Sequence, residues 1–417
     1  MKNNQLPEVR FPEFKDAWEQ RKFENLLDTK NGVRRGPFGS ALKKEIFVSK
    51  SDYVVYEQHN AIYDHYETRY NITESKFKEL SKFSLTEGDF IMSGAGTIGR
   101  ISRVPYGIKQ GVFNQALIRF KINMEITDTE YFIQFVRADN MQKKLTGANP
   151  GSAITNLVPM SEVKKWDVLV PSRHEQQKIG SFFKKFDDTI ALHQHQLNIL
   201  KQTKQGFLQK MFPREGESVP ELRFPGFADD WEQRKLGEVG YFYYGKSAPK
   251  WSVTDDAKTP CVRYGELYTK YGAKISNIYS RTNIEPKNLK FSTGNEVLVP
   301  RVGEKPLDFS LCSWLSIPNV AIGEMISVYN TKENPLFISY YFRSQLTYEF
   351  AKRVEGGNVS NLYYSYLEDI NLVIPKYNEQ IAISNFFEQL DDTIALHQRE
   401  LEILKNTKKA FLQKMFV

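Results

Sequence analysis

The sequence predicts an α+β fold: two globular α/β blocks in a pseudo-two-fold arrangement, separated by two long antiparallel, coiled-coil-like α-helices. Two internal repeats carry this prediction. Pro7–Phe23 matches Pro220–Leu236 at 12 of 17 positions, and Glu175–Phe212 matches Glu379–Phe416 at 25 of 38 positions. Repeats that enclose unlike segments indicate one frame used twice. The octapeptide DDTIALHQ, unchanged in both copies of the second repeat, shows how closely that frame is kept.

The chain has 417 residues, a length that suits two or three domains. The repeats divide it into six segments. The blocks between the repeats resemble each other only near their ends, where GSAITNL (151–157) is similar to GGNVSNL (356–362). The expected order is an N-terminal repeat (1–23), a first variable block (24–174), a first helix (175–212), a linker repeat (213–236), a second variable block (237–378) and a second helix (379–417).

Both helical segments carry a seam of apolar residues at alternating spacings of four and three, which is typical of a coiled coil. A helix of this length spans roughly 57 Å. Antiparallel pairing fits the chain path, and a register with Ile179 opposite Met415 places each seam histidine or lysine against an apolar residue. Lys204 and Lys408 complete the spacing of the seam, whose other residues are Ile179, Phe183, Phe186, Ile190, His193, Leu197, Leu200, Phe207, Met211, Ile383, Phe387, Leu390, Ile394, His397, Leu401, Leu404, Phe411 and Met415.

The two variable blocks show the same order of expected elements. In the first, β-rich stretches at 52–58, 88–93 and 114–122 precede a helical stretch at 129–145. In the second, stretches at 239–245, 295–302 and 321–330 precede a helical stretch at 336–354. Alternating apolar residues with β-branched and aromatic side chains indicate the strands. The parallel order predicts two domains of one fold with different sequences.

The composition excludes several classes of protein. The 57 basic and 50 acidic residues leave a net charge of +7, which suggests a polyanionic partner without proving one. Two cysteines cannot build a disulfide framework, and no Cys/His cluster has zinc-ligand spacing, so we expect no metal. The N-terminus lacks the apolar core of a signal peptide, and no apolar run is long enough to span a membrane. We expect a cytoplasmic protein.

Two motifs resemble nucleotide-binding loops. GYFYYGKS (240–247) matches the phosphate-binding loop pattern, but its aromatic residues predict a strand and Pro249 follows at once. GAGTIG (94–99) matches a dinucleotide pattern, but the residues after it predict a second strand, so we interpret it as a hairpin turn. The paired aspartates of DDTIALHQ point about 100° apart on a helix and suit a solvated or partner-contacting face. We therefore expect no catalytic residues.

The repeats also resemble a known family, the DNA specificity subunits of type I restriction–modification systems. The resemblance covers essentially the whole chain and rests on both PE(V/L)RFP…WEQRK segments, both FF…DDTIALHQ…FLQKMF helices, and the stretches RRGPFGSALKK (34–44) and TPCVRYGELYTKYG (259–272). It implies that each block is a target recognition domain reading one half of an asymmetric, bipartite double-stranded DNA site. It further implies that the helices set the spacing and dock two methyltransferase subunits, which restriction and motor subunits then join.

The resemblance also assigns the chemistry to those partners. S-adenosylmethionine and ATP with magnesium would be used by the methyltransferase and the motor–nuclease, and this chain would bind no cofactor. Two other classes stay open: a protein-only scaffold with a coiled-coil spacer, and a cryptic DNA-modifying enzyme. Sequence-selective retention of DNA separates the scaffold from the specificity subunit, and activity of the isolated chain would identify an enzyme.

Candidate DNA contacts are polar side chains in loops and at strand ends, because arginine or lysine suits guanine and asparagine or glutamine suits adenine. An ordinary polar loop residue is the alternative for each, and an internal ion pair is the alternative for Arg263 and Glu266. In the first block Gln58, His59 and Asn60 are expected to end a strand. The candidates are Arg34, Arg35, Ser40, Lys43, Lys44, Gln58, His59, Asn60, Asn149, Ser152, Asn156, Lys246, Ser247, Lys250, Arg263, Tyr264, Glu266, Arg301, Asn358, Ser360 and Asn361.

Overall fold

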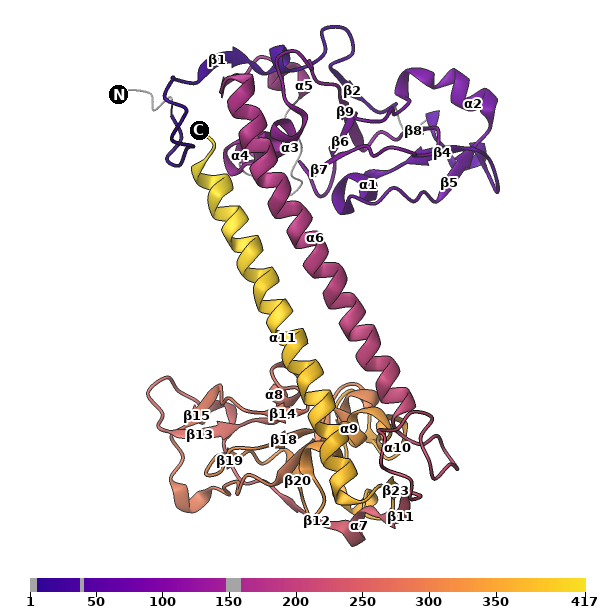
Figure 1. The fold of residues 1–417 in the computed structure, drawn as a ribbon, viewed down its shortest axis with the longest axis vertical. Coiled ribbons are helices and arrows are strands. Elements are labelled where there is room, and N and C mark those ends of the chain that lie inside the picture. Colours follow the sequence, from indigo (N-terminus) through magenta and orange to yellow (C-terminus); the bar gives the residue numbers. More distant parts are fainter. Residues whose placement is uncertain (1–5, 38–40, 148–158) are drawn as a thin grey trace. The chain divides into compact units, whose positions relative to one another are not determined.

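The computed structural model describes residues 6–37, 41–147 and 159–417 and divides the chain into two compact units. The first unit comprises residues 1–195 and 399–417, and the second comprises residues 196–398. Each long helix contributes to both units: α6 spans Arg173–Lys210 and α11 spans Tyr377–Lys414 (Figure 1). Both helices begin before the predicted residues 175 and 379, and both end before residues 212 and 417. No helix in the described part is long and apolar enough to cross a membrane.

The first unit contains two four-stranded sheets, ordered β2-β9-β6-β7 and β3-β5-β4-β8, and a two-stranded β1-β10 ladder. Besides parts of α6 and α11, its helices are α1 (Gln58–Tyr63), α2 (Glu74–Glu79), α3 (Thr129–Arg137), α4 (Asp139–Thr146) and α5 (Met160–Val163). Its strands are β1 (Glu19–Lys22), β2 (Val33–Arg35), β3 (Phe47–Val48), β4 (Tyr53–Tyr56), β5 (Tyr70–Ile72), β6 (Phe90–Ser93), β7 (Ile101–Arg103), β8 (Gly111–Phe113), β9 (Leu117–Phe120) and β10 (Asp167–Val170).

The second unit contains sheets ordered β12-β20-β16-β18-β14, β15-β13-β19 and β17-β22-β21, and a β11-β23 ladder. Its further helices are α7 (Leu236–Val239), α8 (Tyr264–Thr269), α9 (Pro335–Ser344) and α10 (Thr347–Ala351). Its strands are β11 (Glu232–Lys235), β12 (Gly240–Tyr244), β13 (Thr259–Val262), β14 (Lys274–Ile275), β15 (Ser280–Thr282), β16 (Glu296–Pro300), β17 (Val302–Gly303), β18 (Ser313–Leu315), β19 (Ala321–Ile322), β20 (Ile326–Thr331), β21 (Glu355–Gly356), β22 (Ser360–Asn361) and β23 (Asn371–Ile374).

The central strand pairings of the two units correspond, as the order of elements predicted, although the sheets differ in their number of strands. In the first, β9 pairs antiparallel with β2 and β6, and β4 pairs parallel with β8. In the second, β20 pairs antiparallel with β12 and β16, and β13 pairs parallel with β19. The predicted α+β class is confirmed. GYFYY forms strand β12, and GAGTIG is the connection between antiparallel β6 and β7, so both motifs adopt the predicted hairpin and strand structures.

Three predictions about local structure are wrong. Gln58, His59 and Asn60 do not end a strand; strand β4 ends at Tyr56, and these residues open α1 after Glu57, whose backbone amide donates to the Asn60 side chain. The helical stretch 129–145 is interrupted at Ala138, where the backbone is extended between α3 and α4. The helical stretch 336–354 is likewise divided, because α9 ends at Ser344 and α10 begins at Thr347.

Each repeat segment is anchored to the start of a long helix. In the first unit, Arg10 donates two hydrogen bonds of 2.7 Å to Glu175, and Trp18 donates a third. In the second unit, Arg223 donates bonds of 2.6 and 2.7 Å to Glu379. Both glutamates are 1% exposed, so their charges are buried and neutralised by a bidentate guanidinium.

Within each unit the two long helices run antiparallel and are joined by a lysine–aspartate pair. Lys408 donates to Asp187 at 2.6 Å in the first unit, and Lys204 donates to Asp391 in the second. Phe182 packs against Phe411 in the first unit, within one residue of the predicted register. None of the predicted seam residues is exposed: each is buried or half-buried in its unit. His193 lies 3.5 Å from the Glu400 carboxylate.

Candidate nucleic-acid interface

Four chain segments of the first unit meet where strand β2 ends. The Gly36 amide donates to the Leu117 carbonyl at the start of β9, and the Gly94 amide donates to Ala116. The Asn114 amide donates to Tyr56, the last residue of β4. Gln58 then reaches from α1 to the Ala95 carbonyl in the β6–β7 hairpin. A Cβ on Gly36 would lie 1.9 Å from the Asn114 carbonyl oxygen, so this close approach requires glycine.

The same junction exists in the second unit with different side chains. The Gly245 amide donates to Ile326, Arg301 donates to Met325, and Gly323 donates to Val262. A Cβ on Gly245 would lie 2.1 Å from the Gly323 carbonyl oxygen, as at Gly36. The hydrogen bonds therefore equate Gly36 with Gly245 and Gly94 with Arg301. We call these two equivalent surfaces the junction faces.

The turn after β12 is conformationally strained. Ser247 and Ala248 have φ angles of 62° and 70°, a region that residues other than glycine seldom adopt. Strain of this kind clusters at functional sites because the surrounding structure must hold it. Here the Ser247 carbonyl accepts the Glu324 amide, and the Lys246 amide donates to Ile322, so the turn is fixed against β19.

Arginine pairing distinguishes the junction faces from the rest of both units. Thirteen of the 19 arginines donate a hydrogen bond to a carboxylate or a backbone carbonyl, as Arg103 does to Glu130. Among described residues, six have neither such a bond nor an ion pair: Arg34, Arg35, Arg100, Arg263, Arg301 and Arg399. All except the helix residue Arg399 lie in β2, in the β6–β7 hairpin, before α8 or after β16. Unpaired guanidinium groups gathered at such loops are suited to bind an anionic ligand.

Two arginines face each other across β2 and β9. Arg34 is the register partner of Arg119, and both have a buried Nε atom without a hydrogen-bond partner among the described residues. Burial lowers the pKa of the Arg119 guanidinium; Asp89 opposes this shift and Arg34 adds to it. Like charges opposite each other in a sheet are destabilising. An anion at this edge would relieve that repulsion.

The sequence matches the family described as "Type I restriction modification DNA specificity domain" over residues 18–202 and again over residues 228–406. The chain belongs to this family. We call residues 18–202 the first specificity domain and residues 228–406 the second. The two matches agree with the duplicated topology, and the resemblance found in the sequence is confirmed.

Two relatives from Methanocaldococcus jannaschii are similar to this chain along much of their length. The putative type I restriction enzyme MjaX specificity subunit is 20% identical over 432 aligned residues, covering 99% of this chain and 95% of the relative. The type I restriction enzyme MjaIX specificity subunit is 23% identical, covering 83% of this chain and 80% of the relative.

Solved structures show the same fold. The type I restriction–modification S subunit from M. genitalium superposes with a TM-score of 0.63 at 15% identity and covers 99% of both chains. A second solved chain comes from a structural study of complex assembly and conformational transition of the type I R-M system. It superposes with a TM-score of 0.54 at 15% identity and covers 96% of this chain and 97% of that one.

The first specificity domain brings some predicted contacts to its junction face and uses others internally. Arg34, Arg35 and Gln58 lie at the face, and Lys43 and Lys44 are exposed beyond it. Asn60 is fully buried and donates to the His65 and Glu67 carbonyls, so it holds a loop. His59 is half-buried beside that loop. The predicted contacts Ser40, Asn149, Ser152 and Asn156 lie outside the described residues.

In the second specificity domain, Lys246, Ser247, Arg263, Tyr264 and Arg301 lie at the junction face. Glu266 is 5% exposed and accepts bonds from Ser280, Lys270 and the Arg263 backbone amide, so its role is internal, although its ion pair is with Lys270 and not with the Arg263 guanidinium considered as the alternative. Lys250 is exposed at the start of a short 3-10 helix, Lys250–Ser252, after the strained turn. Around β22, Asn358 is exposed, Asn361 half-buried and Ser360 buried.

Sequence reasoning missed Arg100 and Tyr244. Arg100 follows GAGTIG, so its place at the end of a predicted hairpin turn was the available signal. Tyr244 was hidden in an aromatic strand, where alternate side chains face opposite sides of the sheet. Only the structure shows that the Arg301 guanidinium lies over its ring, 4.7 Å from the centroid.

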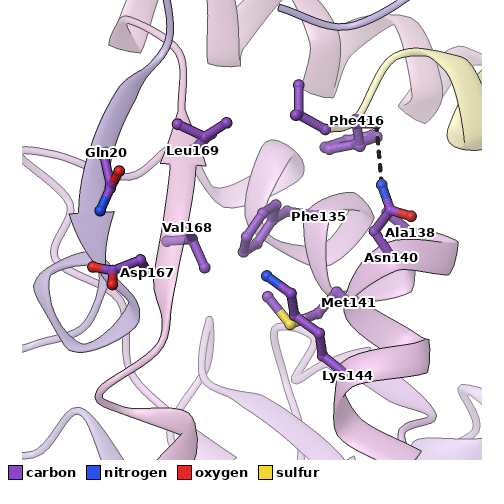
Figure 2. Close-up of a pocket in the computed structure, with 11 residues that line it drawn as sticks. Gln20, Phe135, Ala138, Asn140, Met141, Lys144, Asp167, Val168, Leu169 and Phe416 are labelled. Atoms are coloured by element: carbon purple, nitrogen blue, oxygen red, sulfur yellow. Dashed lines mark hydrogen bonds between the residues drawn. The ribbon is translucent and has the colours of Figure 1, made fainter. Parts of the chain in front are cut away.

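A cavity of about 310 Å³ lies elsewhere in the first unit, between β10, α4 and the C-terminal residues (Figure 2). Apolar Phe135, Val168 and Phe416 form much of its wall, and Asn140 donates to the Phe416 carbonyl. Its ionisable side chains are Lys144 and Asp167, and Asp167 forms an ion pair with Lys22. This lining supplies no nucleophile paired with a base, so it is not our candidate for catalysis.

Proposed function

We propose that this chain selects the DNA sequence on which a type I restriction–modification complex acts. Each specificity domain reads one half of an asymmetric, bipartite duplex site. The observation that carries this proposal is the pair of equivalent junction faces, which have the same backbone frame, unpaired arginines and different side chains. Cationic groups bind the phosphate backbone, whereas the side chains that differ allow different bases to be read.

We further propose that the chain performs no chemistry itself. Two methyltransferase subunits dock on the helical frame and use S-adenosylmethionine, and restriction and motor subunits use ATP with magnesium. The duplicated helix surface supports this stoichiometry, because two copies of one sequence offer two like partners equivalent contacts. The long helices act as a spacer between the half-sites, and the complex works in the cytoplasm, where its DNA is found.

Methylome sequencing tests the proposal. Cells that carry the chain together with its methyltransferase partner are expected to show a split motif methylated at adenine, which disappears when the chain is deleted. Replacement of residues 237–378 by the corresponding block of another family member is expected to change one half of the motif and preserve the other. If deletion of the chain removed no methylated motif, that result would contradict the proposal and favour a protein scaffold. Methylation or cleavage by the isolated chain would favour an enzyme.

A further inference from the structure

The backbone of Arg301 is held in place at the junction face of the second specificity domain. Arg301 follows directly after β16, where its amide donates to the Met325 carbonyl at 3.1 Å. Its carbonyl accepts the Leu362 amide at 2.9 Å. These bonds tie it to the loop before β20 on one side and to the segment after β22 on the other. The base of this side chain is therefore fixed by two neighbouring segments.

The Arg301 side chain is braced by an aromatic stack. Its guanidinium carbon lies 4.7 Å from the centroid of the Tyr244 ring, which in turn packs on Tyr364 with centroids 4.6 Å apart. Phe242 also stacks on Tyr364, with ring centroids 5.6 Å apart and an interplanar angle of 2°. Burial raises the pKa of Tyr244, so the phenol stays neutral, although the Arg301 charge opposes this shift.

The guanidinium has no internal hydrogen-bond partner among the described residues. Its Nε atom is buried and unsatisfied, and no carboxylate forms an ion pair with the side chain. A buried donor left unpaired is costly, so its retention calls for an explanation. The half-buried Arg343 of the same domain shows the usual solution, since it donates to the Gly272 and Cys312 carbonyls.

Two kinds of DNA contact suit an arginine. A phosphate contact needs a charge that can follow the backbone, which an exposed side chain such as Arg35 supplies. Guanine recognition needs a planar fork held at a fixed angle, because two N–H groups must meet O6 and N7 together. Stacking on Tyr244 fixes the plane of the Arg301 guanidinium, which favours the second kind.

We propose that Arg301, braced by Tyr244, reads a guanine in the half-site bound by the second specificity domain. The first domain has Gly94 at the equivalent position and so has no counterpart for this contact. The inference rests on the proposed function and deepens it, because it names one base and the residue that recognises it.

The test uses the complex of the chain with its methyltransferase partner. Selection from a randomised duplex pool gives the preferred motif, and each guanine of that motif is then replaced by 7-deazaguanine, which lacks the N7 acceptor. The wild-type complex is expected to lose about tenfold or more in affinity at one guanine. Arg301→Ala is expected to bind the guanine and 7-deazaguanine duplexes equally. Tyr244→Phe, which keeps the ring, should retain the discrimination, whereas Tyr244→Leu should lower it.

Arg281→Ala is the matched control, because Arg281 belongs to the same domain but donates to the Lys258 carbonyl. It should discriminate as the wild type does. Undiminished discrimination in folded Arg301→Ala would overturn the inference, as would a motif without guanine. If Arg301→Ala instead removed the sensitivity of DNA affinity to methylphosphonate substitution in the duplex, Arg301 would be a phosphate contact. That result would also overturn the inference. If the wild-type complex selected no motif, the proposed function itself would fail.

Discussion

The first and second specificity domains place different side chains on the same backbone junction. Where strand β6 is followed by Gly94, strand β16 is followed by Arg301, and both amides donate to the equivalent loop carbonyl. Helix α1 opens on Gln58, whereas α8 opens on Tyr264. The anchors of the frame are instead repeated, as Glu175 and Glu379 show. The comparison teaches that the repeated residues hold the fold and that the variation is concentrated where DNA would be read.

The largest difference in stability should come from the two anchoring glutamates. Glu175→Ala leaves Arg10 and the Trp18 indole without their shared acceptor, whereas Glu379→Ala leaves Arg223 with the Asp229 carbonyl. We expect about 3 kcal/mol of destabilisation for Glu175→Ala and about 1 kcal/mol less for Glu379→Ala. Urea unfolding of each variant measures this. Equal losses would show that the anchors are energetically the same.

The cross-helix pairs should come next. Asp187→Asn and Asp391→Asn remove the negative charges that pair with Lys408 and Lys204, and each is expected to cost about 1–2 kcal/mol in thermal unfolding. The surroundings of the two aspartates differ, because Gln134 also donates to Asp187, which forms a further ion pair with Arg137, whereas the Tyr340 hydroxyl also donates to Asp391. A loss in only one unit would contradict an equivalent role for the two pairs.

The pH dependence of the first pair follows from the burial of Lys408. Burial lowers the pKa of Lys408 below 10.5, although Asp187 opposes the shift. The folded state therefore releases the proton at lower pH than the unfolded state, and folding stability should rise relative to Lys408→Gln as the pH approaches 10.5. Asp187→Asn should extend this rise to lower pH. If the difference in folding stability between the wild type and Lys408→Gln stayed constant with pH, burial would not lower the pKa of Lys408.

Sequence patterns gave the repeats, the domain order and the common topology because repetition and periodicity are local properties. Pairing is not local: Arg10 meets Glu175 from 165 positions away, so no pattern separated paired arginines from unpaired ones. For the same reason Asn60 and Glu266 looked like surface residues although tertiary packing buries both. The sequence does not predict the start of α1, because the capping arrangement of Glu57 and Asn60 directly follows a β-rich stretch.

A smaller effect should sharpen the comparison at the first junction face. The double variant Arg34→Ala/Arg35→Ala removes two unpaired cations, so binding is expected to fall by about tenfold and the slope of log affinity against log salt by about 1 to 2. Arg21→Ala, whose guanidinium pairs with Glu19, is the matched control. An unchanged slope would remove Arg34 and Arg35 from the phosphate contacts.

The smallest effect should come from the turns before β6 and β16. Thr86 donates to buried Asp89, and Thr293 donates to buried Glu296, which also accepts the Gly294 and Asn295 amides. Thr86→Ala is expected to cost about 1 kcal/mol and Thr293→Ala about half as much, because Glu296 keeps more partners. Chemical denaturation measures both. The reverse order would indicate that the two turns are held differently.

The unpaired arginines of the junction faces have a consequence for how such a protein changes over generations. A side chain that makes no internal bond can be replaced without disturbing its neighbours, so mutations there leave folding nearly untouched. Specificity and stability are then inherited almost separately. A lineage could sample new recognition sequences one substitution at a time, while every intermediate keeps the same helical frame.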